Sequence, residues 1–473
     1  MGLRAQKTLD PVESTAHGDA QRLVYLATSV SALGGMLFGY DIGVISGAIL
    51  FVKKDFSLSA GPEEIVVSSV LLGSLAGAVA GGVLADRLGR RNLLIVAAMV
   101  FGFGAIGAAL APGTGWLVAA RVVAGAAIGI ASFVAPLYIS EIAPVAIRGK
   151  LVSVNQVALT SGIVISYGID YAFAGAQAWR WMFALAVIPA AAFGIGLLFI
   201  PDSPRWLVAR DRIADAQAVL KRIRVPNEVR SELSSIRQSV GQQKAAWSEL
   251  LSPLVRPAMI VGVGLAVAQQ ITGINTVIYY APTILKFAGF SSAPGAILAS
   301  VGVGCVNVTL TLVAMQLIDR VGRRPLLLVS LAGMTLSLLT LGFAFSLPQL
   351  SASLGWIAVV GLMVYVGSFA VGLGPVFWLV LSEIYPLQIR GRAMSVGTVA
   401  NWGANLIVAL SFLTLTQVLG KPATFYLYGV VSIAAWLFAF FLVPETKGRT
   451  LEEIEAHWRA GRNSRESIVS ARG

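Results

Sequence analysis

The chain contains little cysteine, histidine or charge for its length. Its one cysteine, Cys305, lies inside an apolar run, which excludes a disulfide framework and a cysteine-based metal site. The two histidines, His17 and His457, lie near the two ends of the sequence. Charged residues make up 12% of the 473 residues and hydrophobic residues 56%, with a mean hydropathy of +0.79. A soluble chain of this length would form about three domains, but this composition is typical of a polytopic membrane protein.

The sequence also lacks a secretory signal peptide. Its first 20 residues are polar and contain neither an apolar core nor a small-residue cleavage site, so we expect a cytosolic tail. The net charge of +12 would suggest a nucleic-acid partner in a soluble protein. Here the basic residues follow the loops between apolar segments, which is the pattern of membrane topology, and we expect no nucleic-acid partner.

Twelve apolar stretches are long enough to span a bilayer, and the sequence therefore predicts an all-α membrane protein with twelve transmembrane helices. Of the 35 Lys and Arg residues, 29 lie in the two tails and in the loops on the same side, and 5 lie in the opposite loops. By the positive-inside rule both termini are cytoplasmic, in a multi-pass protein of the cell membrane. The predicted spans cover 23–51, 65–85, 92–111, 115–137, 151–173, 180–200, 256–287, 294–318, 325–346, 355–381, 393–417 and 423–443.

An internal repeat divides the spans into two sets of six. The run Asp-Arg-Leu-Gly-Arg-Arg at 86–91 recurs as Asp-Arg-Val-Gly-Arg-Arg at 319–324, and Pro-Asp-Ser at 201–203 recurs as Pro-Glu-Thr at 444–446. Such repeats are typical of transporters that hold substrate between two halves. We expect a cytosolic N-terminal tail, an N-terminal six-helix half, a cytoplasmic helical insert, a C-terminal six-helix half and a cytosolic C-terminal tail, over 1–22, 23–200, 201–255, 256–443 and 444–473.

The insert has two interpretations. It is either a solvated, charged linker or a helical bundle that braces the cytoplasmic gate, and helical spacing over 211–223 favours the bundle. In the second span, Gly73, Gly77 and Gly81 recur every four residues, which predicts close helix packing.

Asp41 is the most unusual residue of the spans. It lies about 18 Å from Lys53, the nearer flanking charge, at the rise of an α-helix. An ionisable group at such depth costs at least about 2.5 kcal/mol on insertion scales, which favours a functional site facing a polar cavity over a purely structural carboxylate. The other 22 carboxyl groups fall in tails, in loops or at span ends, including Asp170 near the end of the fifth span.

Arg121 is the one cation inside a span, and its side chain is long enough to reach Asp41. Burial favours the protonated form of a carboxyl group and a nearby cation favours the ionised form. A mobile Arg121 would therefore switch Asp41 between binding and releasing a proton. The alternative is a static buried salt bridge.

Five motifs in order make the chain resemble the sugar porter family of the major facilitator superfamily, in particular its bacterial proton-coupled monosaccharide symporters. The motifs are Gly-Tyr-Asp at 39–41, Asp-Arg-Leu-Gly-Arg-Arg at 86–91, Pro-Asp-Ser-Pro-Arg-Trp at 201–206, Gln-Gln-Ile-Thr-Gly-Ile-Asn at 269–275 and Pro-Glu-Thr-Lys-Gly at 444–448. The resemblance implies the major facilitator fold. It also implies proton coupling through Asp41 and Arg121, since related uniporters usually carry Asn at the first position.

The same resemblance implies a sugar site in the centre of the spans. Amides match sugar hydroxyls because both donate and accept hydrogen bonds, and an aromatic face covers the apolar face of a pyranose. Gly273 and Pro282 are expected to break the seventh span, which Tyr279 and Tyr280 would gate. The implied sugar contacts are Gln156, Gln269, Gln270, Asn275, Asn307, Trp378, Asn401 and Trp402.

Charged residues at the cytoplasmic span ends have two interpretations. They are topology anchors, and they also suit a set of ion pairs between the halves that forms when the cytoplasmic side closes. These residues are Asp86, Arg90, Glu141, Arg148, Asp319, Arg323, Glu383 and Arg390.

The sequence therefore predicts a monomeric symporter of a monosaccharide and a proton, without enzymatic activity, cofactor or metal. Two departures from the family pattern bear on the sugar. Ile163 stands where xylose symporters place Gln, which favours a hexose such as glucose or galactose, and Ala370 stands where glucose facilitators place a Glu near the inner gate. A uniporter, a pentose or inositol symporter and a sugar sensor that does not transport remain as alternatives.

Overall fold

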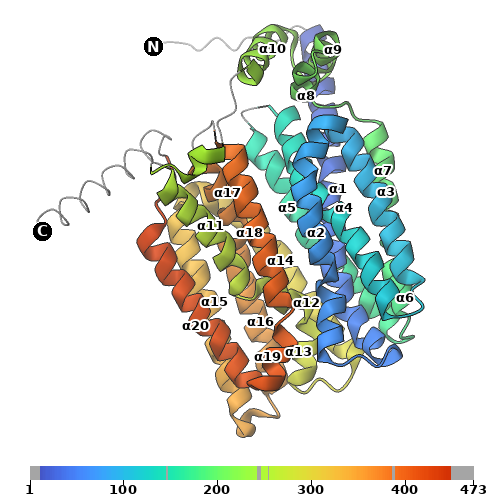
Figure 1. Cartoon of the computed structure of the whole chain (residues 1–473), viewed down its shortest axis with the longest axis vertical. Coiled ribbons are helices and arrows are strands. Elements are labelled where there is room, and N and C mark those ends of the chain that lie inside the picture. Colours follow the sequence, from blue (N-terminus) through green and yellow to red (C-terminus); the bar gives the residue numbers. More distant parts are fainter. Residues whose placement is uncertain (1–10, 145–146, 242–246, 254, 386–388, 449–473) are drawn as a thin grey trace, which may run out of the picture.

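The computed structural model describes residues 11–144, 147–241, 247–253, 255–385 and 389–448. These residues form helices joined by short loops, and no strand occurs among them (Figure 1). Residues 11–200 form α1 (Pro11–Asp55), α2 (Ala60–Leu88), α3 (Arg90–Ala109), α4 (Thr114–Ile142), α5 (Arg148–Ala174), α6 (Trp179–Ala184) and α7 (Val187–Leu198). The insert contains α8 (Pro204–Ala209), α9 (Ile213–Ile223), α10 (Pro226–Gly241) and the short helix η2 (Trp247–Leu251).

The rest of the described chain is helical as well. It forms α11 (Arg256–Ile271), α12 (Ile274–Tyr279), α13 (Ala281–Phe287), α14 (Ala293–Val321), α15 (Arg323–Ser346), η3 (Pro348–Leu350), α16 (Leu354–Val371), α17 (Leu373–Glu383), α18 (Arg390–Ala409), α19 (Phe412–Val418) and α20 (Lys421–Leu442).

Twelve of the described helical segments are long and apolar enough to cross a membrane, which confirms the predicted all-α, twelve-span fold. Several spans consist of consecutive helices separated by a break, such as α11 and α12 or α16 and α17. In Figure 1 the helices of residues 11–200 and those of residues 256–442 form two neighbouring groups. The exact domain boundaries stay a prediction from the sequence repeat.

Helices α1 and α5 approach each other closely because α1 carries a glycine every four residues. Gly35, Gly39, Gly43 and Gly47 all face α5. A Cβ atom at Gly39 would lie 1.8 Å from the carbonyl oxygen of Leu159, so a larger residue does not fit there. This contact fixes the depth at which α1 presents its polar side chains.

Helices α2 and α4 also approach each other closely, because glycines of each helix face the backbone of the other. A Cβ atom at Gly73 or Gly77 would lie about 2 Å from a carbonyl oxygen of α4, and Gly125 and Gly129 of α4 meet α2 in the same way. The predicted close packing is confirmed at Gly73 and Gly77, whereas Gly81 makes an ordinary contact of 3.5 Å with Ile130. Close approach allows interhelical contacts without bulky apolar side chains.

The insert folds as short helices that pack against residues 11–200. Helices α8, α9 and α10 contact one another and lie beyond one end of the bundle, which we call the insert end (Figure 1). Trp206 Nε1 donates to the carbonyl of Asp86, and Arg224 donates to the carbonyl of Ile142 while it pairs with Glu232 at 2.6 Å. A helical insert is confirmed, and its predicted action on the gate stays a prediction.

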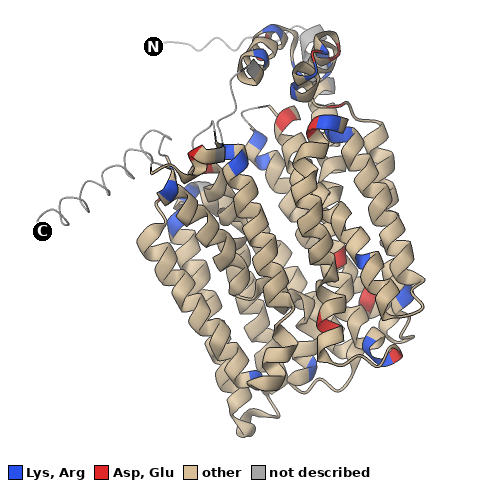
Figure 2. Cartoon of the chain, in the orientation of Figure 1, with Lys and Arg blue, Asp and Glu red and all other residues tan. Residues whose placement is uncertain are grey.

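Lys and Arg gather at the insert end of the bundle, whereas few lie within it (Figure 2). By the positive-inside rule this is the distribution expected if the insert end faces the cytoplasm. Orientation in the membrane is therefore a proposal that rests on charge.

Gly77→Ala is expected to destabilise the protein by about 1–3 kcal/mol, since its methyl group would overpack the contact with α4. A Cβ there would lie 2.1 Å from the carbonyl oxygen of Ala126. Gly82→Ala on the same helix is the control, because its nearest neighbour would be 3.9 Å away. Thermal unfolding in detergent measures both, and equal melting temperatures would contradict the packing argument.

Candidate functional site

Asp41 of α1 and Arg121 of α4 form an ion pair in the interior of the bundle. Arg121 Nη2 lies 3.2 Å from Asp41 Oδ2, and Arg121 Nη1 donates to Asp41 Oδ1 at 3.5 Å. The two residues are 5% and 1% exposed. The sequence-based prediction that Arg121 reaches Asp41 is confirmed, and its role in proton coupling stays a prediction.

The Arg121 side chain also contacts groups other than Asp41. Its Nε donates to the carbonyl of Val66 at 2.9 Å and its Nη2 to that of Val67 at 3.4 Å, both in α2. Its guanidinium also lies 5.8 Å from the centre of the Phe183 ring. Because backbone carbonyls and an aromatic ring contribute to holding the cation, Arg121 has partners that do not depend on the charge of Asp41.

Four of the predicted sugar contacts form one hydrogen-bonded network in the second half. Asn401 Nδ2 donates to Gln269 Oε1 at 2.8 Å, Gln270 Nε2 donates to Asn401 Oδ1 at 3.1 Å, and Asn275 Nδ2 donates to Gln270 Oε1 at 2.9 Å. Gln269 Nε2 also donates to the carbonyl of Leu373. The amides come from α11, α12 and α18, so the network joins three helices around one point.

The other predicted contacts lie outside this network. Trp402, next to Asn401, has its ring centre 5.3 Å from that of Phe38 in α1, so it meets the first half. Trp378 packs against Phe377 and is 38% exposed. Asn307 in α14 is buried and Gln156 in α5 is partly buried.

The seventh span breaks where its sequence predicts. Gly273, between α11 and α12, has a φ of 93°, a left-handed conformation that favours glycine. A second break at Tyr280 separates α12 from α13, which has Pro282 in its first turn. Tyr279 and Tyr280 are fully buried, and Tyr280 stacks on Phe412 with ring centres 5.2 Å apart. Two breaks leave α12 as a six-residue unit able to move between its neighbours.

Three hydrogen bonds link the two halves at the end opposite the insert. The Glu64 carboxylate accepts from the backbone N–H and the hydroxyl of Thr414, at 2.8 and 2.7 Å. Tyr167 of α5 donates to the carbonyl of Ile278 in α12 at 2.8 Å. These bonds hold α2 against α19 and α5 against α12, so the structure is closed at this end.

The predicted charge cluster forms pairs within each half. Arg90 makes two hydrogen bonds to Glu141 and lies 3.2 Å from Asp86, and Arg323 lies 3.0 Å from Glu383. Arg390 Nε donates to the carbonyl of Tyr385, and Arg148 Nε is buried without a hydrogen-bond partner. The side chain of Asp319 lies outside the described part of the structure. Pairing across the halves stays a prediction.

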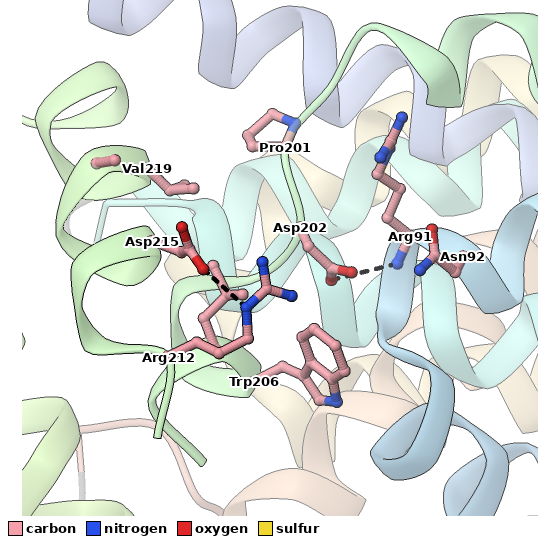
Figure 3. Close-up of a pocket in the computed structure, with 10 residues that line it drawn as sticks. Arg91, Asn92, Pro201, Asp202, Trp206, Arg212, Asp215 and Val219 are labelled. Carbon is pink, nitrogen blue, oxygen red and sulfur yellow. Dashed lines mark hydrogen bonds and ion pairs between the residues drawn. The ribbon is translucent and has the colours of Figure 1, made fainter. Parts of the chain in front are cut away.

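A cavity of about 310 Å³ lies where the insert meets α3 (Figure 3). Arg212 and Asp215 line it as an ion pair at 2.7 Å, and Asp202 accepts from the backbone N–H groups of Arg91 and Ser203. The Arg91 side chain donates to carbonyls of α7. Since these charged groups are already paired, we interpret the cavity as part of the packing between the insert and α3.

Asp202 and Glu445 occupy matching positions in the two repeats but have different protonation behaviour. Burial raises the pKa of the Asp202 carboxyl, although backbone N–H groups and Arg90 oppose the shift. Burial also acts to raise the pKa of Glu445, but four backbone N–H donors, among them those of Lys447, Arg323 and Arg324, outweigh it and hold this pKa below its usual value.

Three acids that the sequence argument assigned to loops or span ends are buried, namely Glu63, Glu64 and Asp170. Position along the fifth span placed Asp170 at a span end, yet the structure places it 0% exposed against α1. Its predicted place near the end of the fifth span is confirmed, but its side chain is buried, so Asp41 is not the one acid buried among the spans. The four-residue glycine spacing of α1 was the signal that could have revealed it, since Gly47 ends that series and faces Asp170.

The sequence matches the family model described as Sugar (and other) transporter over residues 27–458. It is 40% identical over 446 residues to the galactose-proton symporter of Escherichia coli (strain K12), covering 94% of this chain and 96% of that protein. It is 41% identical over 432 residues to the D-xylose transporter of Levilactobacillus brevis, covering 91% and 94%. The solved structure of the proton:xylose symporter XylE bound to 6-bromo-6-deoxy-D-glucose superposes with a TM-score of 0.78 at 34% identity, covering 93% of this chain and 99% of that one.

Glu445→Gln is expected to lower the melting temperature at pH 7 and to have little effect at acid pH. A folded-state pKa below the unfolded value means that the ionised group stabilises the fold above the unfolded pKa, and that this stability is lost as the pH falls through the folded pKa. The matched variant Asp202→Asn is expected to leave the melting temperature at pH 7 unchanged or higher, because a raised pKa favours the fold at low pH instead. Equal responses of the two variants between acid and neutral pH would refute this assignment.

Proposed function

The chain belongs to the sugar transporter family, and from this premise we propose that it is a symporter that carries a monosaccharide together with a proton by alternating access of its two halves. The proposal includes a location in the cell membrane with the insert end in the cytoplasm. The observation that carries it is the buried pair of Asp41 and Arg121 at 3.2 Å, in a bundle that also contains an amide network. The amides can form hydrogen bonds with a sugar, and the carboxyl group of Asp41 can bind a proton.

In the proposed cycle Asp41 carries the proton. When Arg121 lies against it, the carboxylate is stable in its ionised form, and when the pair separates the protonated form is favoured. Arg121 keeps the carbonyls of Val66 and Val67 and the Phe183 ring as partners while Asp41 is protonated. Since the cation has these other partners, breaking the pair leaves no bare charge, and this supports a mobile pair over a static one.

The sugar is proposed to bind at the amides Gln269, Gln270, Asn275 and Asn401. In the structure these groups bond to one another. A sugar hydroxyl donates and accepts as an amide does, so it can replace an amide partner without leaving a buried group unsatisfied. Trp402, Trp378, Gln156 and Asn307 are proposed to complete the site from the surrounding helices.

The bonds between Glu64 and Thr414 and between Tyr167 and Ile278 support a conformation in which the outer end, opposite the insert, is closed. Opening the outer end would break a few hydrogen bonds, each worth about 0.5–1.5 kcal/mol, so the change is reversible.

With about 100 mV and about 1 pH unit directed inward, one proton supplies about 2.3 plus 1.4 kcal/mol, enough for several-hundred-fold accumulation of the sugar.

Within the monosaccharides we propose a hexose such as glucose or galactose. Ile163, buried at 2% exposure, offers an apolar surface in place of an amide. The galactose-proton symporter supports a hexose, whereas the xylose transporters among the similar proteins support a pentose as the alternative. Competition of glucose, galactose, xylose, arabinose and inositol against labelled uptake in proteoliposomes decides between them.

Addition of the transported sugar to energised vesicles is expected to alkalinise the external medium. A symporter removes one or more protons from the side on which sugar is added, whereas a uniporter moves sugar without a pH change. A pH electrode and labelled sugar flux are recorded on the same vesicles. Normal sugar flux without a pH change would establish a uniporter in place of the symporter.

Asp41→Asn is expected to abolish sugar uptake driven by a pH gradient and to retain sugar exchange between the two sides of the membrane. Asn keeps the shape of the acid but cannot carry a proton. Asp55→Asn, on the same helix and exposed at its end, is the control and should accumulate sugar normally. Loss of both uptake and exchange in Asp41→Asn would mean that the residue is structural.

Gln270→Ala is expected to raise the apparent sugar constant at least about tenfold, which corresponds to about 1.4 kcal/mol of binding. The variant removes a group that bonds to both Asn275 and Asn401. Gln316→Ala, on the exposed surface of α14, is the matched control. An unchanged constant would remove Gln270 from the sugar site.

A further inference from the structure

Asp170 of α5 is a buried acid that the mechanism above does not use. Its side chain is 0% exposed, no side chain in the described structure donates a hydrogen bond to its carboxyl group, and the donor beside it is the backbone N–H of Gly47 in α1. Asp41, by contrast, contacts Arg121. Asp170 lies one turn from Ala174, where α5 ends, about 6 Å from the outer end of the helix.

The carboxyl group of Asp170 lies against the backbone of α1. A Cβ atom at Gly47 would come within 2.3 Å of Asp170 Oδ2 and 2.6 Å of its Cγ, so glycine at position 47 creates the space that the acid occupies. The side chain of the preceding residue, Ser46, is also buried. The nearby Tyr40 and Tyr167 hydroxyls donate elsewhere, to the carbonyls of Met182 and Ile278.

The cations of the helices packed around α5 are engaged at other places. Arg121 of α4 binds Asp41, and Arg180 of α6 lies 3.7 Å from Asp55 and over the Trp179 ring. Lys53 of α1 pairs with Glu63.

The remaining charged groups on these helices lie at the surface or at the far end of the bundle. Lys54 of α1 is exposed two turns beyond Gly47. The others lie near the insert end of their helices: Glu13, Asp19 and Arg22 of α1, Glu141 of α4, Arg148 and Lys150 of α5, and Asp319 and Arg320 of α14. Asp170 therefore has no countercharge among the described groups that would stabilise its ionised form.

We infer that Asp170 is a second proton-binding site, occupied by a proton while the outer end is closed. An ionised carboxylate that faces one backbone N–H and no cation is strongly disfavoured in a dry interior, whereas a neutral acid is both donor and acceptor. The bound proton on Asp170 is inferred from the structure alone. Its effect on transport, described next, rests on the proposed alternating access.

A proton on Asp170 would affect transport because the contacts that close the outer end lie next to this residue. Tyr167, one turn from Asp170, bonds to α12. The hydroxyls of Tyr280, at the break between α12 and α13, and of Thr283 in α13 are buried without hydrogen-bond partners. When α12 and α13 leave α1 and α5, water reaches this polar band and Asp170 can ionise. The outer end closes again once Asp170 has regained its proton, so external pH controls the closing step through a group distinct from Asp41.

Infrared difference spectroscopy tests the bound proton without any transport. In full-length purified protein at pH 7, wild type is expected to show the C=O stretch of a neutral carboxylic acid that is absent from Asp170→Asn. The band should persist in Asp55→Asn, which serves as the control. A spectrum of Asp170→Asn that retains the full wild-type band would overturn the inference, whatever the outcome for transport.

Sugar exchange tests the role in closing. Exchange by Asp41→Asn is expected to slow about fivefold or more when external pH rises from 6 to 9, because closing needs a proton on Asp170. The double variant Asp41→Asn with Asp170→Asn should lose this pH dependence, since Asn is neutral at every pH. An unchanged pH dependence would contradict the closing role. If Asp170→Asn does not fold, the smaller neutral Asp170→Ser replaces it in both experiments.

Discussion

Arg121 contacts Asp41 at a depth where neither bulk water nor lipid headgroups can solvate the two charges. An ionised Asp41 would be strongly disfavoured without Arg121, so the pair constrains where α1 and α4 meet. The glycine series of α1 and of α2 sets the distances that allow this meeting, because α1 packs directly on α5 and α2 directly on α4. Arg121 then reaches the carbonyls of Val66 and Val67, which only a closely packed α2 can offer.

The same constraint governs the amides of the second half. Gln269, Gln270 and Asn401 are each about 95% buried, and each has an amide partner. A buried amide without a partner would destabilise the fold, whereas a partner that is too strong would compete with sugar. Neutral amide pairs meet both requirements, because exchanging one for a sugar hydroxyl changes the number of hydrogen bonds little. In the proposed mechanism the first half contributes charged groups and the second half contributes neutral polar groups.

Hydropathy and loop charge predicted the twelve spans, since both follow from the cost of exposing polar groups to lipid. Gly273 predicted the break in the seventh span because few other residues adopt its backbone conformation. The depth of Asp170 was not predictable from its position in the span, since burial depends on how α5 is rotated against α1. Nor could the sequence predict which of the amides of α11, α12 and α18 bond to one another, because this depends on how the three helices pack. Nor does the sequence predict which end is closed, because the alternative conformations of such a protein differ by a few kcal/mol.

Helix α12 is where the chemistries of the two halves meet. It begins after Gly273 and ends at Tyr279, so both of its ends are breaks in the span. Within these six residues Asn275 bonds to Gln270 in the amide network, while Tyr279 is close enough to Asp41 and Arg121 to interact with both electrostatically. Its Ile278 carbonyl accepts the bond from Tyr167, one turn from Asp170. If sugar binds at the proposed amide site, a shift of this short helix would change the surroundings of both Asp41 and Asp170, which gives a physical route from an uncharged substrate to the protonation of the opposite half.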